Sequence, residues 1–245
     1  MNNLVPHPLL KRPLTVRKRD VFGSGKKGGT YLASHFKVGK KLGDGHGVTV
    51  NLAELKSTKD VIALKKISKE FLVTKEQQLY VISEIKNQLK LGLHPYILPL
   101  LDVFWTYQTI YLVLPLATYG SLFDKWCPNG NPVKFTNKEA GKYTYQIASA
   151  IDYCHGLNVI HRDLKMENVL VDSNGNAQLS DFGYSTHFNN RRRSIVGTLS
   201  YHAPEMAKRN GEEYGKEVDC WALGVILFEM LTGDSPFDDS HEDIV

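Results

Sequence analysis

The hydrophobic pattern of this sequence changes its period near Gly120. Before that point, short runs rich in β-branched, aromatic and aliphatic residues alternate with Gly-, Ser- and Asp-containing turns, a pattern typical of strands. These runs cover residues 36–42, 49–55, 61–67 and 96–116. After Gly120 the apolar residues recur at helical spacing, and residues 217–231 form an apolar stretch of helical length. We therefore expect a β-rich first part with one helix and a mainly helical second part, without internal repeats.

Two capping boxes predict where helices begin, because a Thr followed three residues later by Gln or Glu satisfies free N–H groups at a helix start. Thr74-Lys-Glu-Gln77 predicts a helix to about Leu91, and Thr136-Asn-Lys-Glu139 predicts another to about Cys154. Apolar residues share one face of each helix: Leu79, Ile82, Ile85 and Leu89 in the first, and Tyr143, Ile147, Ile151 and Cys154 in the second. Between two short apolar runs, Asn174-Gly175 predicts a small hairpin.

The net charge of +4 is carried by the N-terminal part of the chain. Residues 1–35 contain seven Lys or Arg and one Asp, so the other 23 basic and 25 acidic residues leave the body nearly neutral. Three prolines and a Gly-rich run at 23–29 predict that residues 1–35 are a flexible basic extension. Such a tail could be a nuclear localisation signal or contact nucleic acid. Because Phe22 and Tyr31 are its only aromatic residues, a solubilising arm is favoured over nucleic-acid binding.

Composition and cysteine content exclude several classes of protein. The hydrophobic fraction of 42% and charged fraction of 23% are those of a globular protein rather than a disordered one. No apolar run approaches the length of a membrane helix, and Met1 is not followed by a signal core. Three widely spaced cysteines suit a reducing compartment and form no zinc motif. We expect an intracellular protein of the cytoplasm or nucleus, with no membrane partner.

A glycine-rich segment, Leu42-Gly-Asp-Gly-His-Gly-Val-Thr-Val50, lies between two expected strands. Glycines let backbone N–H groups approach phosphate oxygens, but alone such a segment is more often only a turn. Fifteen residues after Val50, Lys65 ends the strand-like Ile62-Ala-Leu-Lys65 and can reach phosphates if an acid holds it. Glu84, on the following expected helix, is a candidate for that acid.

The most specific motif is His161-Arg-Asp-Leu-Lys-Met-Glu-Asn168, followed by Asp181-Phe-Gly183. It supplies a candidate base in Asp163 and a phosphate-reaching cation in Lys165. Asn168 and Asp181 add two oxygen ligands of the kind that Mg²⁺ prefers. Because both pieces occur in this order within about twenty residues, a chance match is very improbable.

Here the chain resembles the eukaryotic protein kinases over about residues 36–240. Ala203-Pro-Glu205 resembles the end of a kinase activation segment, and Asp219-Cys-Trp-Ala-Leu-Gly224 resembles the helix beneath the catalytic loop. The resemblance implies an α+β, bilobal protein-kinase fold. Its N-lobe would be an antiparallel sheet with one helix, and its C-lobe would be mainly helical. The implied boundaries are 36–114 for the N-lobe, 115–120 for the hinge and 121–245 for the C-lobe.

The resemblance also implies ATP and Mg²⁺ as cofactors and assigns roles to residues. Lys65, paired with Glu84, would grip the α- and β-phosphates. Asp163 would orient and deprotonate the substrate hydroxyl, and Lys165 would neutralise charge on the transferred group. The implied ATP-binding set is Leu42, Gly43, Asp44, Gly45, His46, Gly47, Val48, Thr49, Val50, Ala63, Lys65, Leu114, Pro115, Ala117 and Leu170. In that set Leu114 would be the gatekeeper, Pro115 would offer its carbonyl to adenine and Ala117 its N–H.

Single residues within the resemblance imply the class of kinase and its substrate preference. Lys165 and Thr198 are similar to their counterparts in Ser/Thr kinases. Glu167 and Glu229 are similar to acids that basophilic kinases use to read arginine, which implies protein substrates with Ser or Thr near Arg or Lys. For Glu229 the alternative is a surface acid of a helix.

Ser194 follows three arginines in the implied activation segment, and it and Thr198 are candidate regulatory phosphosites. A phosphate there adds negative charge that can draw in arginines, and Arg162 is its expected partner. A regulatory protein is a further possible partner. The segment Asp181–Tyr201 and Gln88 resemble Aurora-type kinases. The Glu229 region is equally similar to the cyclic-AMP-dependent and calmodulin-kinase-related groups.

The chain departs from the kinase pattern at three points. Gly47 occupies the place of the usual loop-tip aromatic and Val48 that of the third glycine, so ATP affinity is expected to be lowered. Met166 replaces a proline without loss of a catalytic atom. The sequence stops soon after Phe237, where further C-lobe helices are expected, and Glu205 would then be a buried carboxylate without its arginine. A catalytically weak, kinase-like scaffold is the alternative function, although the presence of Lys65, Asp163 and the other motif residues argues against it.

Overall fold

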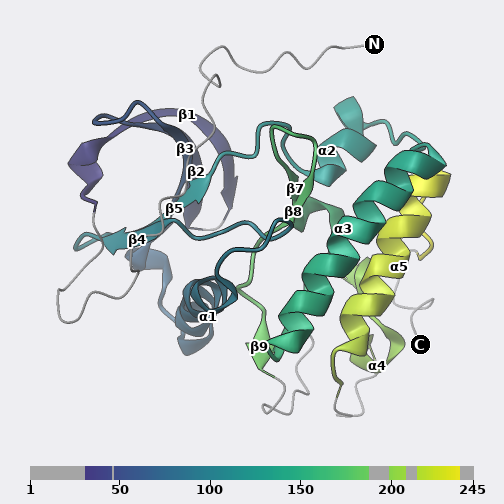
Figure 1. Cartoon of the computed structure of the whole chain (residues 1–245). Coiled ribbons are helices and arrows are strands. Elements are labelled where there is room, and N and C mark those ends of the chain that lie inside the picture. The colour runs from purple at the N-terminus through teal and green to yellow at the C-terminus, as the bar shows by residue number, and fades with distance from the viewer. Residues whose placement is uncertain (1–30, 46, 188–198, 208–213, 238–245) are drawn as a thin grey trace. The chain divides into compact units, whose positions relative to one another are not determined.

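The computed structural model describes residues 31–45, 47–187, 199–207 and 214–237 (Figure 1). These residues form two compact units. The first contains the chain up to Gly92 together with Pro99–Thr118, and the second contains Leu93–Leu98 together with the chain from Tyr119 onward.

A five-stranded antiparallel sheet forms the body of the first unit, with strand order β1-β2-β3-β5-β4. Its strands are β1 (Phe36–Gly45), β2 (Val48–Leu55), β3 (Val61–Ser68), β4 (Asp102–Trp105) and β5 (Thr109–Pro115). Short 3-10 turns η1 (Ala33–His35) and η2 (Lys69–Phe71) precede β1 and follow β3. One face of the sheet carries an apolar core in which Phe36 and Phe104 stack with ring centroids 5.7 Å apart. The three expected strands before residue 68 are thus confirmed.

The expected strand over residues 96–116 is wrong in its first part. Residues 96–98 belong to the second unit, where Leu98 N–H donates to Leu179 O and Leu179 N–H donates to Tyr96 O. Only β4 and β5 continue the first sheet. Pro99 lacks the N–H group that a continuous central strand needs, which explains the interruption.

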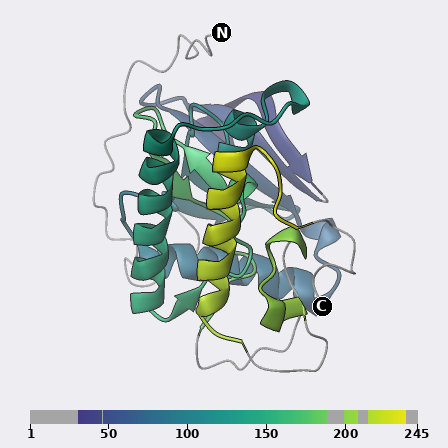
Figure 2. The ribbon, with the colours of Figure 1, turned by 90° about the vertical axis from the view of Figure 1, so that its right-hand side faces the viewer.

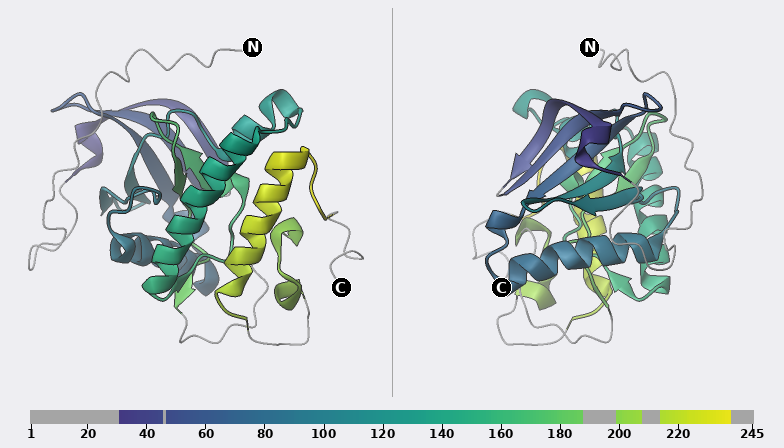
Figure 3. Two further views of the ribbon diagram at one scale, coloured as in Figure 1. Left: turned by 45° about the vertical axis from the view of Figure 1, so that its right-hand side comes forward. Right: turned by 90° about the vertical axis from the view of Figure 1, so that its left-hand side faces the viewer.

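Helix α1 (Lys75–Leu91) lies along one side of the sheet (Figure 3). It begins at the expected capping box: Gln77 N–H donates to Thr74 Oγ1 at 3.2 Å and Thr74 N–H to Gln77 Oε1 at 2.9 Å. The buried residues are not the apolar stripe read from the sequence, since Leu79 and Ile82 are exposed. They are instead Val81, Glu84, Asn87, Gln88 and Leu91.

The second unit is built on two long helices, α3 (Asn137–Gly156) and α5 (Glu217–Thr232), which lie side by side (Figure 2). The expected inner face of α3 is confirmed, because Tyr143, Ile147, Ile151 and Cys154 are all buried. The shorter helices and turns are α2 (Leu122–Trp126), η3 (Pro128–Gly130), η4 (Met166–Asn168), η5 (Leu199–Tyr201) and α4 (Pro204–Ala207). In α4, Glu205 is half-buried, so the expected penalty for a fully buried carboxylate does not apply.

Two small antiparallel ribbons complete this unit. The first joins β6 (Val159–Ile160) to β9 (Thr186–His187), and the second joins β7 (Val169–Val171) to β8 (Ala177–Leu179). The β7–β8 hairpin confirms the expectation from Asn174-Gly175, and Gly175 has the positive φ of +73° that its turn requires. No helix among the described residues is long and apolar enough to cross a membrane.

Candidate active site

An ion pair between Lys65 and Glu84 lies inside the first unit. Lys65 is on the central strand β3, and its Nζ lies 2.5 Å from Glu84 Oε1 in the middle of α1. The side chain of Glu84 is 3% exposed and that of Lys65 is 13% exposed. A buried ion pair is retained only with good geometry because desolvation of both groups is costly. The pair that the sequence suggested is therefore formed, and it also explains why α1 turns a charged residue inward.

The glycine-rich segment forms the hairpin between β1 and β2. Gly43 pairs with Val50 and Gly45 with Val48. A Cβ atom added at Gly43 or Gly45 would meet no protein atom within 4 Å. Protein packing therefore does not require glycine at these two positions, and their open backbone fits the close approach of phosphate groups.

The expected adenine-binding residues are divided between the units. In the first, Ala63 pairs with Leu114 and Ile62 with Pro115, and Ala63 and Leu114 are both buried. Val50 pairs with Lys65, Ala117 lies just beyond the end of β5, and Leu42 is 43% exposed. Leu170, on β7, belongs to the second unit. His46 lies outside the described residues.

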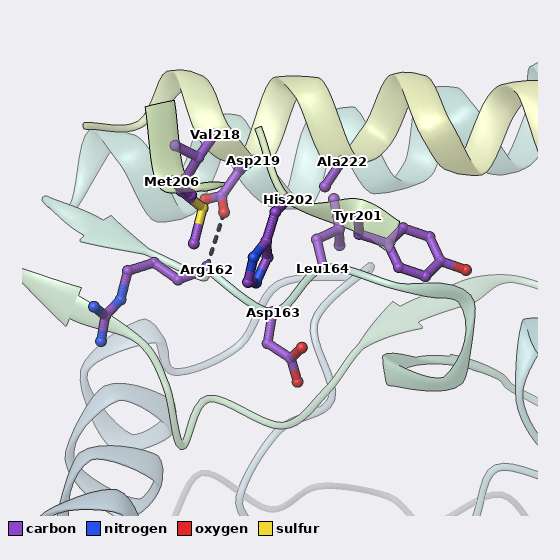
Figure 4. A pocket seen from close by; sticks show the side chains of 9 residues that line it. All are labelled: Arg162, Asp163, Leu164, Tyr201, His202, Met206, Val218, Asp219 and Ala222. Atoms are coloured by element: carbon purple, nitrogen blue, oxygen red, sulfur yellow. Dashed lines mark hydrogen bonds between the residues drawn. The ribbon is translucent and has the colours of Figure 1, made fainter. Parts of the chain in front are cut away.

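The catalytic-loop motif follows β6, and Asp219 of α5 holds it in place through hydrogen bonds (Figure 4). Asp219 Oδ2 accepts from His161 N–H and Asp219 Oδ1 from Arg162 N–H, both at 2.9 Å. The Nε2 of His155, on α3, lies 2.8 Å from Asp219 Oδ2. Asp219 is 1% exposed, so these charge-assisted bonds form away from water, where they are strong.

Sequence reasoning placed Asp219 beneath the loop but missed this role, and it missed His155 altogether. The available signal was a carboxylate, Asp219, among the apolar residues of a largely apolar helix. A carboxylate at that place is expensive to bury unless it has a structural or functional partner.

Asp163 is buried, and one of its oxygens is contacted by two neighbours. Asp163 Oδ2 accepts from Asn168 Nδ2 at 2.9 Å and lies 3.3 Å from Lys165 Nζ. Asn168 Nδ2 also donates to the carbonyl oxygen of Asp163 at 2.8 Å. In Figure 4 the carboxylate of Asp163 points away from α5. The loop thus brings together a carboxylate, a cation and an amide.

His161 ties the catalytic loop to the segment that begins at Asp181. Asp163 N–H donates to His161 Nδ1 at 3.3 Å, so the proton of the ring is on Nε2, which lies 2.9 Å from Ser180 O. The ring of Phe182 meets His161 edge-on at 5.0 Å. One buried side chain therefore orients both functional segments of this unit.

The residues expected to hold Mg²⁺ have suitable donor atoms. Because Asn168 directs its amide nitrogen toward Asp163, its oxygen is the atom left to ligate a metal. Asp181 has a φ of +59°, and its Oδ1 accepts from Gly183 N–H at 3.3 Å. Among the described residues, no group of three or more His, Cys, Asp or Glu could hold a metal. Mg²⁺ is usually held by one or two carboxylates together with substrate phosphates, and Asp181 supplies one such carboxylate.

Arg162, the expected phosphate partner, is buried in the second unit. Its Nε donates to Tyr184 O at 2.6 Å and its Nη1 to Tyr214 Oη at 3.2 Å. Arg162 also has a positive φ of +68°, which is uncommon for a residue with a side chain. Ser194 and Thr198, the expected phosphosites, lie outside the described residues.

Glu229 is buried in α5 and is not a surface acid. It is 4% exposed, and its Oε2 accepts from Tyr201 Oη at 2.8 Å. Burial raises the pKa of Glu229 from 4.5 to about 7; the charge of Glu167 adds to the rise and the Tyr201 hydrogen bond opposes it. Burial, followed by the charge of Glu229, also raises the pKa of Tyr201. The two acids expected to read arginine are therefore close enough to interact electrostatically.

Comparison with known proteins agrees with this geometry. The family model described as "Protein kinase domain" matches residues 36–245. The chain belongs to the protein kinase family. It is 37% identical to Aurora/IPL1-related protein kinase 2 of Caenorhabditis elegans, in an alignment covering 94% of this chain and 73% of that protein. It is 38% identical to Aurora kinase B of Drosophila melanogaster (96% and 73% covered). It is 39% identical to serine/threonine-protein kinase Aurora-1 of Arabidopsis thaliana (85% and 69% covered).

These relatives identify the kinase as a eukaryotic protein kinase of the Ser/Thr class and of Aurora type. Its fold is the α+β, bilobal kinase fold expected from the sequence, with the antiparallel sheet in one unit and the long helices in the other. The substrate class of a protein kinase is protein, and the family's nucleotide is ATP.

Proposed function

We propose that this kinase transfers the γ-phosphoryl group of ATP to Ser and Thr hydroxyl groups of protein substrates. The observation that carries the proposal is the arrangement around Asp163, whose carboxylate has Lys165 and Asn168 beside it on a loop fastened by Asp219. In this scheme Asp163 orients the attacking hydroxyl and accepts its proton. Lys165 faces the negative charge of the transferred group, and such electrostatic stabilisation supplies much of the rate in phosphoryl transfer.

We also propose which residues contact the nucleotide. Lys65, fixed by Glu84, would contact the α- and β-phosphates, and the open backbone of Gly43 and Gly45 would admit them. Bound Mg²⁺ would neutralise phosphate charge, with Asn168 and Asp181 as its protein ligands. The direct test is equilibrium binding of ATP with and without Mg²⁺ to the unsubstituted chain and to Asn168→Ala. Equal binding under all these conditions would contradict the assigned ligands.

We propose that the kinase prefers substrates in which the target Ser or Thr lies near Arg or Lys. Glu167 is exposed, Glu229 is buried nearby, and the negative charge of Glu167 contributes to the raised pKa of Glu229. An arginine of the substrate would relieve this repulsion by neutralising both, which favours basic peptides over neutral ones. A peptide-library phosphorylation assay tests this with Glu167→Gln and Glu229→Gln as variants. A preference for acidic or proline-directed sites would refute it.

Regulation through the activation segment is the second part of the proposal. Ser194 follows Arg191, Arg192 and Arg193, so its surroundings resemble the proposed substrate motif and favour autophosphorylation. A phosphate at Ser194 or Thr198 would attract Arg162, which would exchange its present contacts for a charge-assisted one. Ser194→Ala is expected to lower activity, and unchanged activity would exclude a switch at this residue. We also propose that a regulatory protein binds the kinase.

The alternative function is a kinase-like scaffold that binds partners with little catalysis. The replacement of the third glycine by Val48 is the observation that favours it. ATP-dependent phosphorylation of a basic protein by the purified chain would exclude this alternative. We further propose that the kinase acts in the cytoplasm or nucleus, which its cysteine content supports.

A further inference from the structure

The glycine-rich hairpin is anchored at its tip to the end of strand β3. The pairing of Gly45 with Val48 leaves two residues to connect β1 and β2. Gly47, the second of these, has a φ of +73°, and its carbonyl oxygen accepts from Ser68 N–H at 2.8 Å. The hairpin tip is therefore tied to residues that directly precede η2.

Phe71, the last residue of η2, packs directly on Gly47. A Cβ atom added to Gly47 would lie 2.5 Å from the Cβ of Phe71 and 2.6 Å from its Cγ. The side chain of Phe71 thus occupies the space into which any side chain at position 47 would project. Gly43 and Gly45 differ in this respect, since a Cβ at either would meet nothing within 4 Å.

We propose that Phe71 is a positioning residue for ATP. By the resemblance to other kinases, position 47 should carry the loop-tip aromatic, and in this chain that position is Gly47. Phe71, on the connection between β3 and α1, packs an aromatic ring against the same tip. This packing would hold the hairpin in its position over the phosphates. A hairpin held in place before binding loses less conformational freedom when the nucleotide arrives, so the packing strengthens ATP binding. The inference rests on the proposed function, because the hairpin matters only if it binds phosphates.

The exposure of Phe71 separates this role from a contribution to the core. Phe71 is 41% exposed, so its removal takes away the contact with the hairpin without opening a buried cavity. Val73, two residues further along the same connection, is also apolar and is 79% exposed. It is a matched control, because Val73→Ala removes apolar surface from this segment without removing the Phe71 atoms that face Gly47.

The experiment measures KM for ATP and kcat, at saturating basic peptide, for the unsubstituted kinase and for Phe71→Ala, Phe71→Tyr and Val73→Ala. Loss of binding shared by ground state and transition state raises KM and leaves kcat unchanged. We expect Phe71→Ala to raise KM for ATP about three- to tenfold with kcat within about twofold. Phe71→Tyr keeps the ring and should resemble the unsubstituted kinase, as should Val73→Ala.

Two outcomes distinguish this inference from the proposed function. If the unsubstituted kinase binds ATP and Phe71→Ala leaves KM unchanged, or lowers only kcat, the role of Phe71 is refuted and the proposed function stands. If the unsubstituted kinase neither binds ATP nor transfers phosphate, the proposed function is refuted and this inference with it.

A double-mutant cycle tests the contact itself. Gly47→Ala adds a Cβ to a residue with positive φ and also forces that atom against Phe71. The backbone strain and the 2.5 Å approach to the Cβ of residue 71 are present in both backgrounds, but the approaches of 2.6 Å to Cγ and 3.0 Å to Cδ2 exist only when Phe71 is present. We expect Gly47→Ala to raise KM for ATP by a smaller factor in the Phe71→Ala background than alone. Equal factors would show that the two residues do not act together and would overturn the proposal.

Discussion

The buried carboxylate of Glu229 should make the stability of this kinase fall as pH rises. Burial raises the pKa of Glu229 from 4.5 to about 7 in the folded protein. The folded state therefore binds more protons than the unfolded state between these values, and the free energy of unfolding decreases as pH rises through them. Stability from this group is fully present below about pH 4.5 and is lost once pH exceeds about 7.

Glu229→Gln removes this dependence, because glutamine is neutral throughout and keeps an oxygen that can accept from Tyr201 Oη. With about 1.36 kcal/mol per unit of pKa shift, the variant should gain roughly 2–3 kcal/mol in free energy of unfolding over the unsubstituted kinase between about pH 5 and pH 8. Denaturant unfolding at a series of pH values measures this difference. Glu167→Gln should give a smaller change of the same sign, because Glu167 contributes only part of the pKa rise.

Asp152→Asn is the matched control, since Asp152 is an exposed acid on α3. It should leave the pH profile of stability unchanged. Parallel pH profiles for Glu229→Gln and the unsubstituted kinase would refute the reasoning, because they would mean that Glu229 titrates alike in the folded and unfolded states.

Three further predictions concern other residues of the candidate site. Lys65→Met should abolish activity and lower the free energy of unfolding by about 3 kcal/mol, because it leaves the buried Glu84 without its ion pair. Adding Glu84→Gln should restore the free energy of unfolding but not kcat. Denaturant unfolding and kinase assays measure the two effects. Asp219→Asn should lower stability by about 2–3 kcal/mol and reduce kcat, because two charge-assisted bonds to the catalytic loop are weakened; unchanged kcat would contradict the anchoring role. KM for an arginine-containing peptide should fall as pH rises from about 6 to 8, as Glu229 ionises, and this dependence should be absent in Glu229→Gln.

The sequence predicted those parts of the fold that depend on local signals. The capping boxes at Thr74 and Thr136 gave the starts of α1 and α3 because capping is set by a few adjacent residues. The strands β1, β2 and β3 followed from their alternating pattern. The face that α1 buries could not be read in this way, since it depends on the contact of Glu84 with Lys65, nineteen residues earlier.

The same distinction between local signals and long-range contacts holds for the candidate site. Asp163 was found from a specific local motif, and Lys65 gained its role from the resemblance of the whole motif set to protein kinases. The burial of Glu229 was not foreseen, because it depends on Tyr201 and the chain around it. The contact between Phe71 and Gly47 likewise joins residues of different local patterns, and only the folded hairpin brings them together.

The central claim is that Asp163 acts as the base of a phosphotransferase, and one measurement tests it most directly. The purified chain is incubated with Mg²⁺ and ATP labelled in the γ-phosphate, together with a basic protein substrate, in parallel with Asp163→Asn. The account predicts label on Ser and Thr of the substrate, with a rate about 10²–10⁴-fold lower for Asp163→Asn at unchanged folding. Equal rates for the two proteins, or no transfer by the correctly folded unsubstituted chain, would contradict it.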